Sequence, residues 1–167
     1  MANGIFERQG VLFVDGYGYA GRCMSFSAPV IEEVMQEHVA GGYGGTVEIP
    51  MGRVASMEST MTLKTHDPKL NKAMSKPDVS IKYRASAVDD DGTEHSIRYE
   101  LRGRISRWEE AEKTPEGEHT VSLRMHVTSF AKFVDDEEVF FIDIKALVYR
   151  PDGSEDVWEN LRKSLGL

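Results

Sequence analysis

Residues 79–87 read VSIKYRASA, and this stretch decides the fold class. Every odd position is apolar or small and every even position is polar, apart from the tyrosine that stands among the odd ones. Successive side chains of a β-strand point to opposite faces, so this alternation predicts a strand with one buried face and one wet face. The same period of two recurs in residues 97–105 and 121–127, and more weakly in residues 57–64. Such strands are typical of antiparallel sheets, whereas parallel strands are buried on both faces.

Turn signals separate these strands. Asp91-Gly92 predicts a hairpin between a strand that ends near Val88 and one that starts near His95. Asp15-Gly16 predicts that residues 11–14 turn back into residues 19–26, and the acidic run 135–138 predicts a turn between residues 130–134 and 139–144. Pro151, Asp152 and Gly153 interrupt the chain after Tyr149.

Two helices are expected. Asp67 and Pro68 form a helix start, because proline at the first positions loses no hydrogen bond, and the helix continues to Met74. A second helix is expected over residues 154–164, where Val157 and Leu161 recur at helical spacing. Residues 30–39 are ambiguous, since the local periodicity of their apolar residues favours a helix.

The length, charge and cysteine content of the chain limit the functions that it can have. The chain has 167 residues, 40% hydrophobic, which suffices for one domain spanning residues 1–167. Its net charge of −8 argues against holding a nucleic-acid backbone by attraction. The single cysteine, Cys23, cannot form an internal disulfide and fits a reducing compartment. The sequence contains neither a signal-peptide pattern nor an apolar run of membrane-spanning length, so no membrane partner is expected.

The sequence shows no constellation for chemistry, so neither enzyme activity nor a cofactor is expected. The five histidines have no metal-ligand spacing with one another or with Cys23. The acidic stretch 89–92 does not match a calcium loop and is interpreted as a solvated turn. The glycine-rich stretch 41–45 is followed by a strand-like segment rather than by a helix, so it does not match a phosphate-binding loop.

Several short motifs, in order along nearly the whole chain, resemble the major tail tube proteins of contractile-tailed bacteriophages and of contractile bacteriocins. They are LFVDG (12–16), YAG (19–21), APV (28–30), EHVAGG (37–42), VEIPMG (47–52), DP (67–68), LRGR (101–104), DEEV (136–139) and LGL (165–167).

The resemblance implies a mainly β fold: an antiparallel β-sandwich or barrel-like tail tube domain with one short flanking helix and a C-terminal helix. It also implies an extended strand in residues 30–39, against the local pattern, and we follow the resemblance there. Members of the family form hexameric rings that stack into a tube inside the contractile sheath. The implied partners are further copies of the chain, the tail sheath, baseplate, tail terminator and tape measure proteins. The implied location is the virion tail, after assembly in the host cytoplasm.

Two sets of residues are expected to serve the tube. The first is a flexible loop expected to contact the next ring: Ala40, Gly41, Gly42, Tyr43, Gly44, Gly45 and Thr46. The second is a group of acids, some expected to face the lumen, where negative charge lets DNA pass without sticking: Glu32, Glu33, Glu37, Glu48 and Glu58. Surface solubility explains these acids equally well. Arg98, Arg102 and Arg104 are expected to meet solvent, a neighbouring subunit or the sheath rather than DNA.

Three rival function classes are weighed against the tail tube. A monomeric ligand-binding β-barrel has the same alternation, and ligand screens would reveal it. A tube subunit of a contractile bacteriocin or of a type VI secretion-like system has the same architecture, and genomic neighbours would distinguish it. An enzyme has the least support.

Overall fold

The structure is a computed structural model that describes residues 4–117 and 119–167, so residues 1–3 and 118 of the expected single domain lie outside it. The elements in chain order are β1 (Ile5–Val14), β2 (Tyr17–Gly18), β3 (Cys23–Ser27), β4 (Glu33–His38), β5 (Val47–Val54), β6 (Met57–Leu63), α1 (Pro68–Met74), β7 (Val79–Asp89), β8 (Glu94–Glu110), β9 (Val121–Val134), β10 (Glu137–Asp143), β11 (Val148–Arg150) and α2 (Glu159–Ser164).

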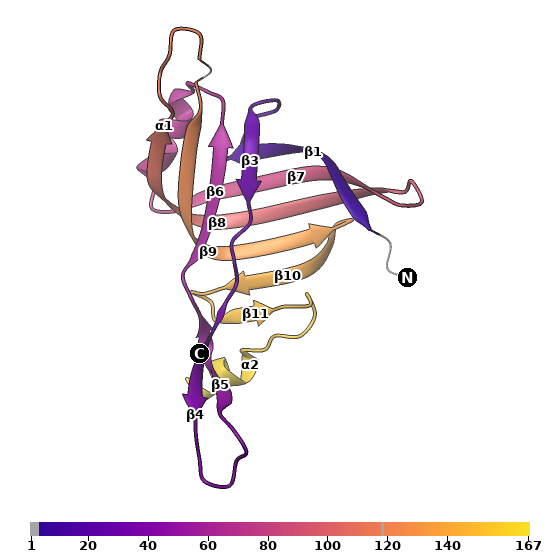
Figure 1. Cartoon of the computed structure of the whole chain (residues 1–167), viewed down its shortest axis with the longest axis vertical. Coiled ribbons are helices and arrows are strands. Elements are labelled where there is room, and N and C mark those ends of the chain that lie inside the picture. The colour runs from indigo at the N-terminus through magenta and orange to yellow at the C-terminus, as the bar shows by residue number, and fades with distance from the viewer. Residues whose placement is uncertain (1–3, 118) are drawn as a thin grey trace.

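The strands form one large antiparallel sheet and one separate hairpin. The large sheet runs in the order β11-β10-β9-β8-β7-β1-β2, while β4 and β5 pair only with each other among the described residues. The first half of β9 pairs with β6, which in turn pairs with β3, and the second half pairs with β10. Figure 1 shows β3 and β6 crossing in front of the remaining strands at a steep angle. The predicted mainly antiparallel β class is therefore confirmed.

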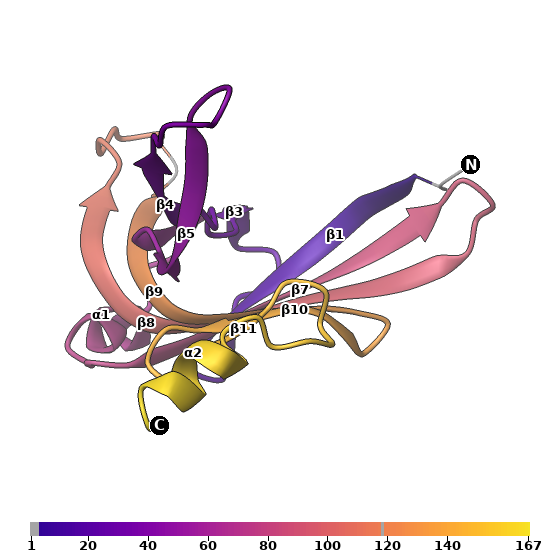
Figure 2. The same cartoon turned by 90° about the horizontal axis from the view of Figure 1, so that it is seen from below.

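The sheet bends where β8 and β9 shift register, between Arg102 and Gly103. A Cβ added to Gly103 would lie 2.0 Å from the carbonyl oxygen of His126, and its φ is +159°. Only glycine lets the two backbones approach this closely. The bend turns the paired ends of β8 and β9 together out of the plane of the remaining sheet (Figure 2). In this part β9 also pairs with β6, which in turn pairs with β3.

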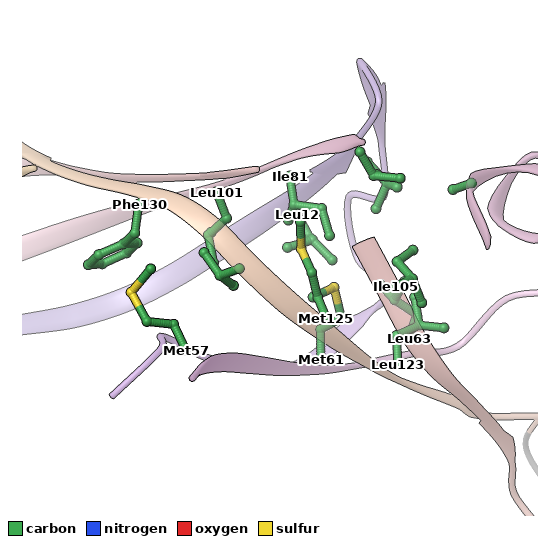
Figure 3. Packing of buried hydrophobic residues seen from close by; sticks show 14 of the residues in the cluster. Leu12, Met57, Met61, Leu63, Ile81, Leu101, Ile105, Leu123, Met125 and Phe130 are labelled. Atoms are coloured by element: carbon green, nitrogen blue, oxygen red, sulfur yellow. The ribbon is translucent and has the colours of Figure 1, made fainter. Parts of the chain in front are cut away.

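The predicted alternation builds the core. Val79, Ile81 and Leu101 are fully buried on the face of the sheet that β6 and β3 cover. Figure 3 shows Met57 of β6 near Leu101 and Phe130, and Met61 near Met125. Leu63 of the same strand lies near Ile105 and Leu123. Burying each such side chain stabilises the fold by about 1.5–3 kcal/mol.

A row of aromatic rings crosses five neighbouring strands on the same face. Tyr83, Tyr99, Phe130, Phe140 and Tyr149 come from β7, β8, β9, β10 and β11, with successive ring centroids 5.6–6.2 Å apart. The row is extended at one end by Phe26, stacked 4.6 Å from Tyr83, and at the other by Trp158, 5.2 Å from Tyr149. These contacts tie the sheet to β3 and to the C-terminal segment.

Two turn predictions are confirmed and one is wrong in its pairing. The β7–β8 hairpin turns at Asp91-Gly92, and β9 turns directly into β10 at Asp135 and Asp136, so the rest of that acidic run lies in β10. After Asp15-Gly16, however, only β2 returns along β1. Residues 19–22 turn again, with the N–H of Arg22 donating to the carbonyl of Tyr19, and β3 pairs with β6 instead.

The first predicted helix is confirmed and the second is shorter than predicted. Asp67 caps α1, since its carboxylate accepts the N–H of Lys69 at 2.9 Å. α2 begins at Glu159 rather than at residue 154, because the carboxylate of Asp152 accepts the N–H groups of Ser154 and Glu155 and holds a turn there. Residues 33–38 form strand β4, as the resemblance implied and against the local helical pattern.

Candidate assembly interface

The β1 margin of the large sheet is open. Among the described residues, no strand pairs with residues 5–11 on the side away from β7, and β2 covers only Phe13 and Val14. Ile5 and Phe6 expose 47% and 59% of their surface there. A groove of about 290 Å³ separates this edge from β3, lined by residues 7–10 and 23–26 together with Tyr83. An open strand edge is a template for another chain, so this margin is a candidate interface.

The β11 margin is closed by the chain itself. The N–H of Tyr149 donates to the carboxylate of Asp156 at 3.0 Å, and the carbonyl of Tyr149 accepts the N–H of Val157 at 2.8 Å. Trp158 then packs against Tyr149, and only 5% of its surface is exposed. Gly153 packs closely against β10, since a Cβ added to it would lie 1.9 Å from the carbonyl oxygen of Glu138. Within the described residues, the outward polar groups of Tyr149 are thus bonded by the chain itself rather than left for a partner.

The β4–β5 hairpin projects from the body of the molecule (Figures 1 and 2). Its loop contains all seven residues of the predicted contact loop, all exposed except the half-buried Ala40. Tyr43 exposes 62% of its surface, and a Cβ on Gly41, Gly42, Gly44 or Gly45 would meet no atom within 4 Å. An isolated two-stranded ribbon is only marginally stable in water, so the hairpin is a second candidate interface.

The structure separates the five predicted lumen acids. Glu37 and Glu48 are direct cross-strand partners on the hairpin, and neither has a cation within the described residues. Glu33 lies at the base of the hairpin. The pKa of the Tyr149 hydroxyl is raised, first by burial and second by the charge of Glu33. Glu32 immediately precedes β4. Glu58 lies apart on β6, 3.6 Å from Arg124.

The three arginines of β8 lie on the face of the sheet opposite the core. Arg98 is held at 2.7 Å by Asp136 and at 3.2 Å by Glu100, and its guanidinium packs 4.4 Å from the ring centroid of Phe133. Arg102 and Arg104 are exposed.

A histidine cluster at the tips of two hairpins was not anticipated from the sequence. The Nδ1 of His95 lies 2.7 Å from Asp135, and its Nε2 lies 3.4 Å from Asp89. These two contacts, in that order, raise the pKa of His95. The pKa of Asp89 is lowered, chiefly by the N–H of Thr93, and that of Asp135 is lowered by His95 first. In the sequence His95 lies six positions after Asp89 but 40 positions before Asp135, so no local pattern indicates the cluster.

A second pair, His66 and His119, stacks with ring centroids 3.6 Å apart although 53 positions separate the two residues in the chain. Within residues 4–117 and 119–167, no group of three or more His, Cys, Asp or Glu side chains is arranged to hold a metal ion. None of the helices in the same residues is long and apolar enough to cross a membrane.

Comparison with known proteins identifies the family. The model of the phage tail tube protein FII family matches residues 8–166, nearly the whole chain. The chain belongs to this family. The resemblance seen in the short motifs is thereby confirmed, and the family is one of structural tube subunits rather than of enzymes.

A curated relative supports the assignment over the same length. The major tail tube protein of Serratia phage KSP20 is 23% identical over 160 residues, which cover 93% of this chain and 92% of that protein. The tail tube protein described here is accordingly a structural component of a phage tail.

A solved structure shares the fold. The sheath/tube terminator of an extracellular contractile injection system superposes with a TM-score of 0.56 at 14% identity, covering 75% of this chain and 93% of that one. A crystal structure of an Hcp protein gives a TM-score of 0.36 at 14% identity over 65% of this chain and 75% of its own, too low to support an argument.

Proposed function

We propose that this tail tube subunit forms hexameric rings that stack into the inner tube of a contractile phage tail and serve as a conduit for DNA during ejection. The open β1 margin carries the proposal. A subunit with seven residues of unpaired strand edge beside a groove is incomplete alone, and pairing that edge with a neighbour removes it.

The asymmetry of the sheet supports a closed ring. Because the β11 margin is sealed by Asp156 and Val157, the neighbour cannot pair with this chain at both ends of the sheet. The β1 edge and the groove beside it therefore receive a different surface of the next subunit. Such a heterologous contact repeats around an axis until the ring closes.

The β4–β5 hairpin is the proposed contact between rings. Its loop stands clear of the body, and glycine leaves the backbone free to approach another chain closely. The sheath, baseplate, terminator and tape measure proteins are proposed as the further partners of the assembled tube, and the host cytoplasm as the place of assembly.

The lumen is proposed to be lined in part by the hairpin acids. Glu37 and Glu48 place two uncompensated carboxylates side by side, and such a surface repels the phosphate backbone. Glu58 is a weaker candidate, because Arg124 lies beside it. The arginine-bearing face of β8 is proposed to meet solvent, a neighbouring subunit or the sheath.

Electron microscopy of the purified chain tests the proposal. Rings about as wide as a phage tail, and tubes of stacked rings, are the expected particles. Monomers at every concentration tested would reject the assembly function.

Changing Gly41 and Gly42 to Val tests the role of the hairpin loop. The subunit is expected to stay folded and to form rings, while stacking is impaired, because the bulky side chains fill open space only in the loop. Far-ultraviolet circular dichroism and microscopy would measure both. Gly42 has a φ of +96°, so Gly41→Val alone serves as the control that adds bulk without backbone strain. Tubes of normal length from both variants would show that the loop does not form the contact between rings.

A further inference from the structure

A pocket of about 360 Å³ lies in the half of the molecule opposite the β4–β5 hairpin. It is lined by Gly18, Tyr19, Arg22, Thr65, His66 and Asp67. Figure 1, with the longest axis vertical, shows the hairpin at one end, while the chain between β8 and β9 reaches furthest at the other, with the top of β6 and α1 beside its base. When copies are placed head to tail along this axis, the hairpin of one therefore approaches the half of the next that holds the pocket.

The walls of the pocket are fixed and its rim is cationic. The hydroxyl of Tyr19 donates to Asp67 at 3.2 Å, and burial, followed by the charge of Asp67, raises the pKa of Tyr19 to about 12. His66 is held by its stack on His119. Arg22 is exposed, and its side chain has no hydrogen-bond or ion-pair partner among residues 4–117 and 119–167. The adjoining helix α1 carries Lys69 and Lys72 and no acidic residue.

The hairpin has the complementary character. Tyr43 is an exposed aromatic ring between pairs of glycines, so its approach to a second chain is sterically unhindered. Behind it, Glu37 faces Glu48 across the strands, and like charges that face each other destabilise a ribbon unless a cation joins them. Three acids near this end already have partners: Glu109 pairs with Arg107, Glu110 pairs with Lys113, and Asp67 accepts from the hydroxyl of Tyr19 and from the N–H of Lys69.

We propose that the hairpin loop of one copy enters this pocket in the next copy, with the ring of Tyr43 against the guanidinium of Arg22 and Glu37 and Glu48 at the cationic rim. The inference rests on the proposed stacking function and names the surface that receives the loop. An arginine over an aromatic ring stabilises a contact and also sets its orientation. Because the hairpin loop and the pocket lie on opposite sides of one chain, the contact repeats without closing and gives a filament.

Disulfide trapping tests the contact while it leaves Tyr43 and Arg22 in place. In a Cys23→Ser background, Gly44→Cys is combined with His66→Cys, both at exposed positions. Mild oxidation of assembled tubes is expected to give a ladder of covalent dimers, trimers and longer chains. The matched control combines Gly44→Cys with Asn160→Cys, an exposed residue of α2 at the hairpin's own end, and is expected to stay monomeric.

A double-mutant cycle provides the second measurement. Arg22→Ala and Tyr43→Ala are each expected to raise the concentration needed for tube formation about tenfold, and the double variant is expected to be no worse than either single variant. Tubes without a ladder, or losses that add in the double variant, would overturn the inference and leave the proposed function standing. A wild-type chain that never forms tubes would overturn both.

Discussion

The two margins of the large sheet differ in what completes them. At β11 the chain folds back on itself: Asp156 and Val157 bond both polar groups of Tyr149, and Trp158 closes the row of aromatic rings. At β1 the edge of residues 5–11 has no partner strand among the described residues, and Phe6 is mostly exposed. One margin thus obtains its stability from within the subunit, and the other is left for a neighbour.

This difference separates folding from assembly. Substitutions at the β11 margin should unfold the isolated subunit, because they remove contacts that the monomer already makes. Substitutions at the β1 margin should leave the monomer almost unchanged and act only when rings form, because the contacts they remove are made between chains.

Replacing Trp158 with Ala should have the largest effect. The side chain is almost fully buried against Tyr149, and truncation of a buried aromatic residue costs about 3–5 kcal/mol. Urea unfolding should show a lower midpoint at an unchanged slope. Phe6→Ala is the matched control at the open margin, where the expected loss is below about 0.5 kcal/mol, with reduced ring formation. Equal losses in the two monomers would erase the distinction between the margins.

Replacing Asp156 with Ala should have an intermediate effect. Its carboxylate accepts bonds from the N–H groups of Tyr149 and Trp158 and from Arg162, so the loss should be about 1–3 kcal/mol. Burial raises the pKa of Asp156, but the hydrogen bonds and the charge of Arg162 together lower it by a larger amount, so the net shift is downward. The stabilisation is therefore present above the ordinary carboxyl pKa of about 3.9 and is lost as the pH falls through the lowered value.

The matched control is Asp90→Ala at the open margin, where Asp90 accepts the N–H of Gly4 at 3.1 Å. Chemical denaturation at pH 7 and at pH 3 measures both variants. A pH-independent loss at Asp156 would show that the residue acts through packing alone.

The sequence predicted the local structure better than the long-range pairing. Period-two alternation located β7, β8 and β9, because each buries one face against the same core. It did not predict that β3 leaves β1 for β6, since a turn signal such as Asp15-Gly16 fixes where a chain reverses but not which strand it joins. α2 was predicted too long, because Asp152 holds a local turn with the N–H groups of Ser154 and Glu155, and Asp156 is bonded to the N–H of Tyr149 instead of lying in a helix.

The interface residues show the same limit. The glycine-rich loop was recognisable in the sequence, since small residues mark a backbone free to approach another chain. The pocket at the opposite end was not, because Arg22 and His66 are brought together only by the pairing of β3 with β6. The cluster of His95, Asp89 and Asp135 likewise depends on two hairpins meeting at their tips.

Replacing His95 with Gln should have the smallest effect, and one that depends on pH. His95 bridges Asp135 and Asp89 beside the open margin, and the ion pairs of Glu94 with Arg8 and of Asp136 with Arg98 flank it. Because the folded state raises the pKa of His95, the stabilisation is complete below the ordinary histidine pKa of about 6.5 and is lost as the pH rises through the raised value.

The cluster also loses its stabilising effect at acidic pH, because the pKa values of Asp89 and Asp135 are lowered in the folded state. The pH range in which the cluster stabilises the fold therefore lies between the ordinary aspartate pKa and the raised pKa of His95. Thermal unfolding of wild type and His95→Gln at pH 5.5 and pH 8.5 measures the effect. The wild type should have the higher melting temperature at pH 5.5, and the two curves should converge at pH 8.5. A constant difference would mean that the imidazole of His95 acts by packing rather than through its charge.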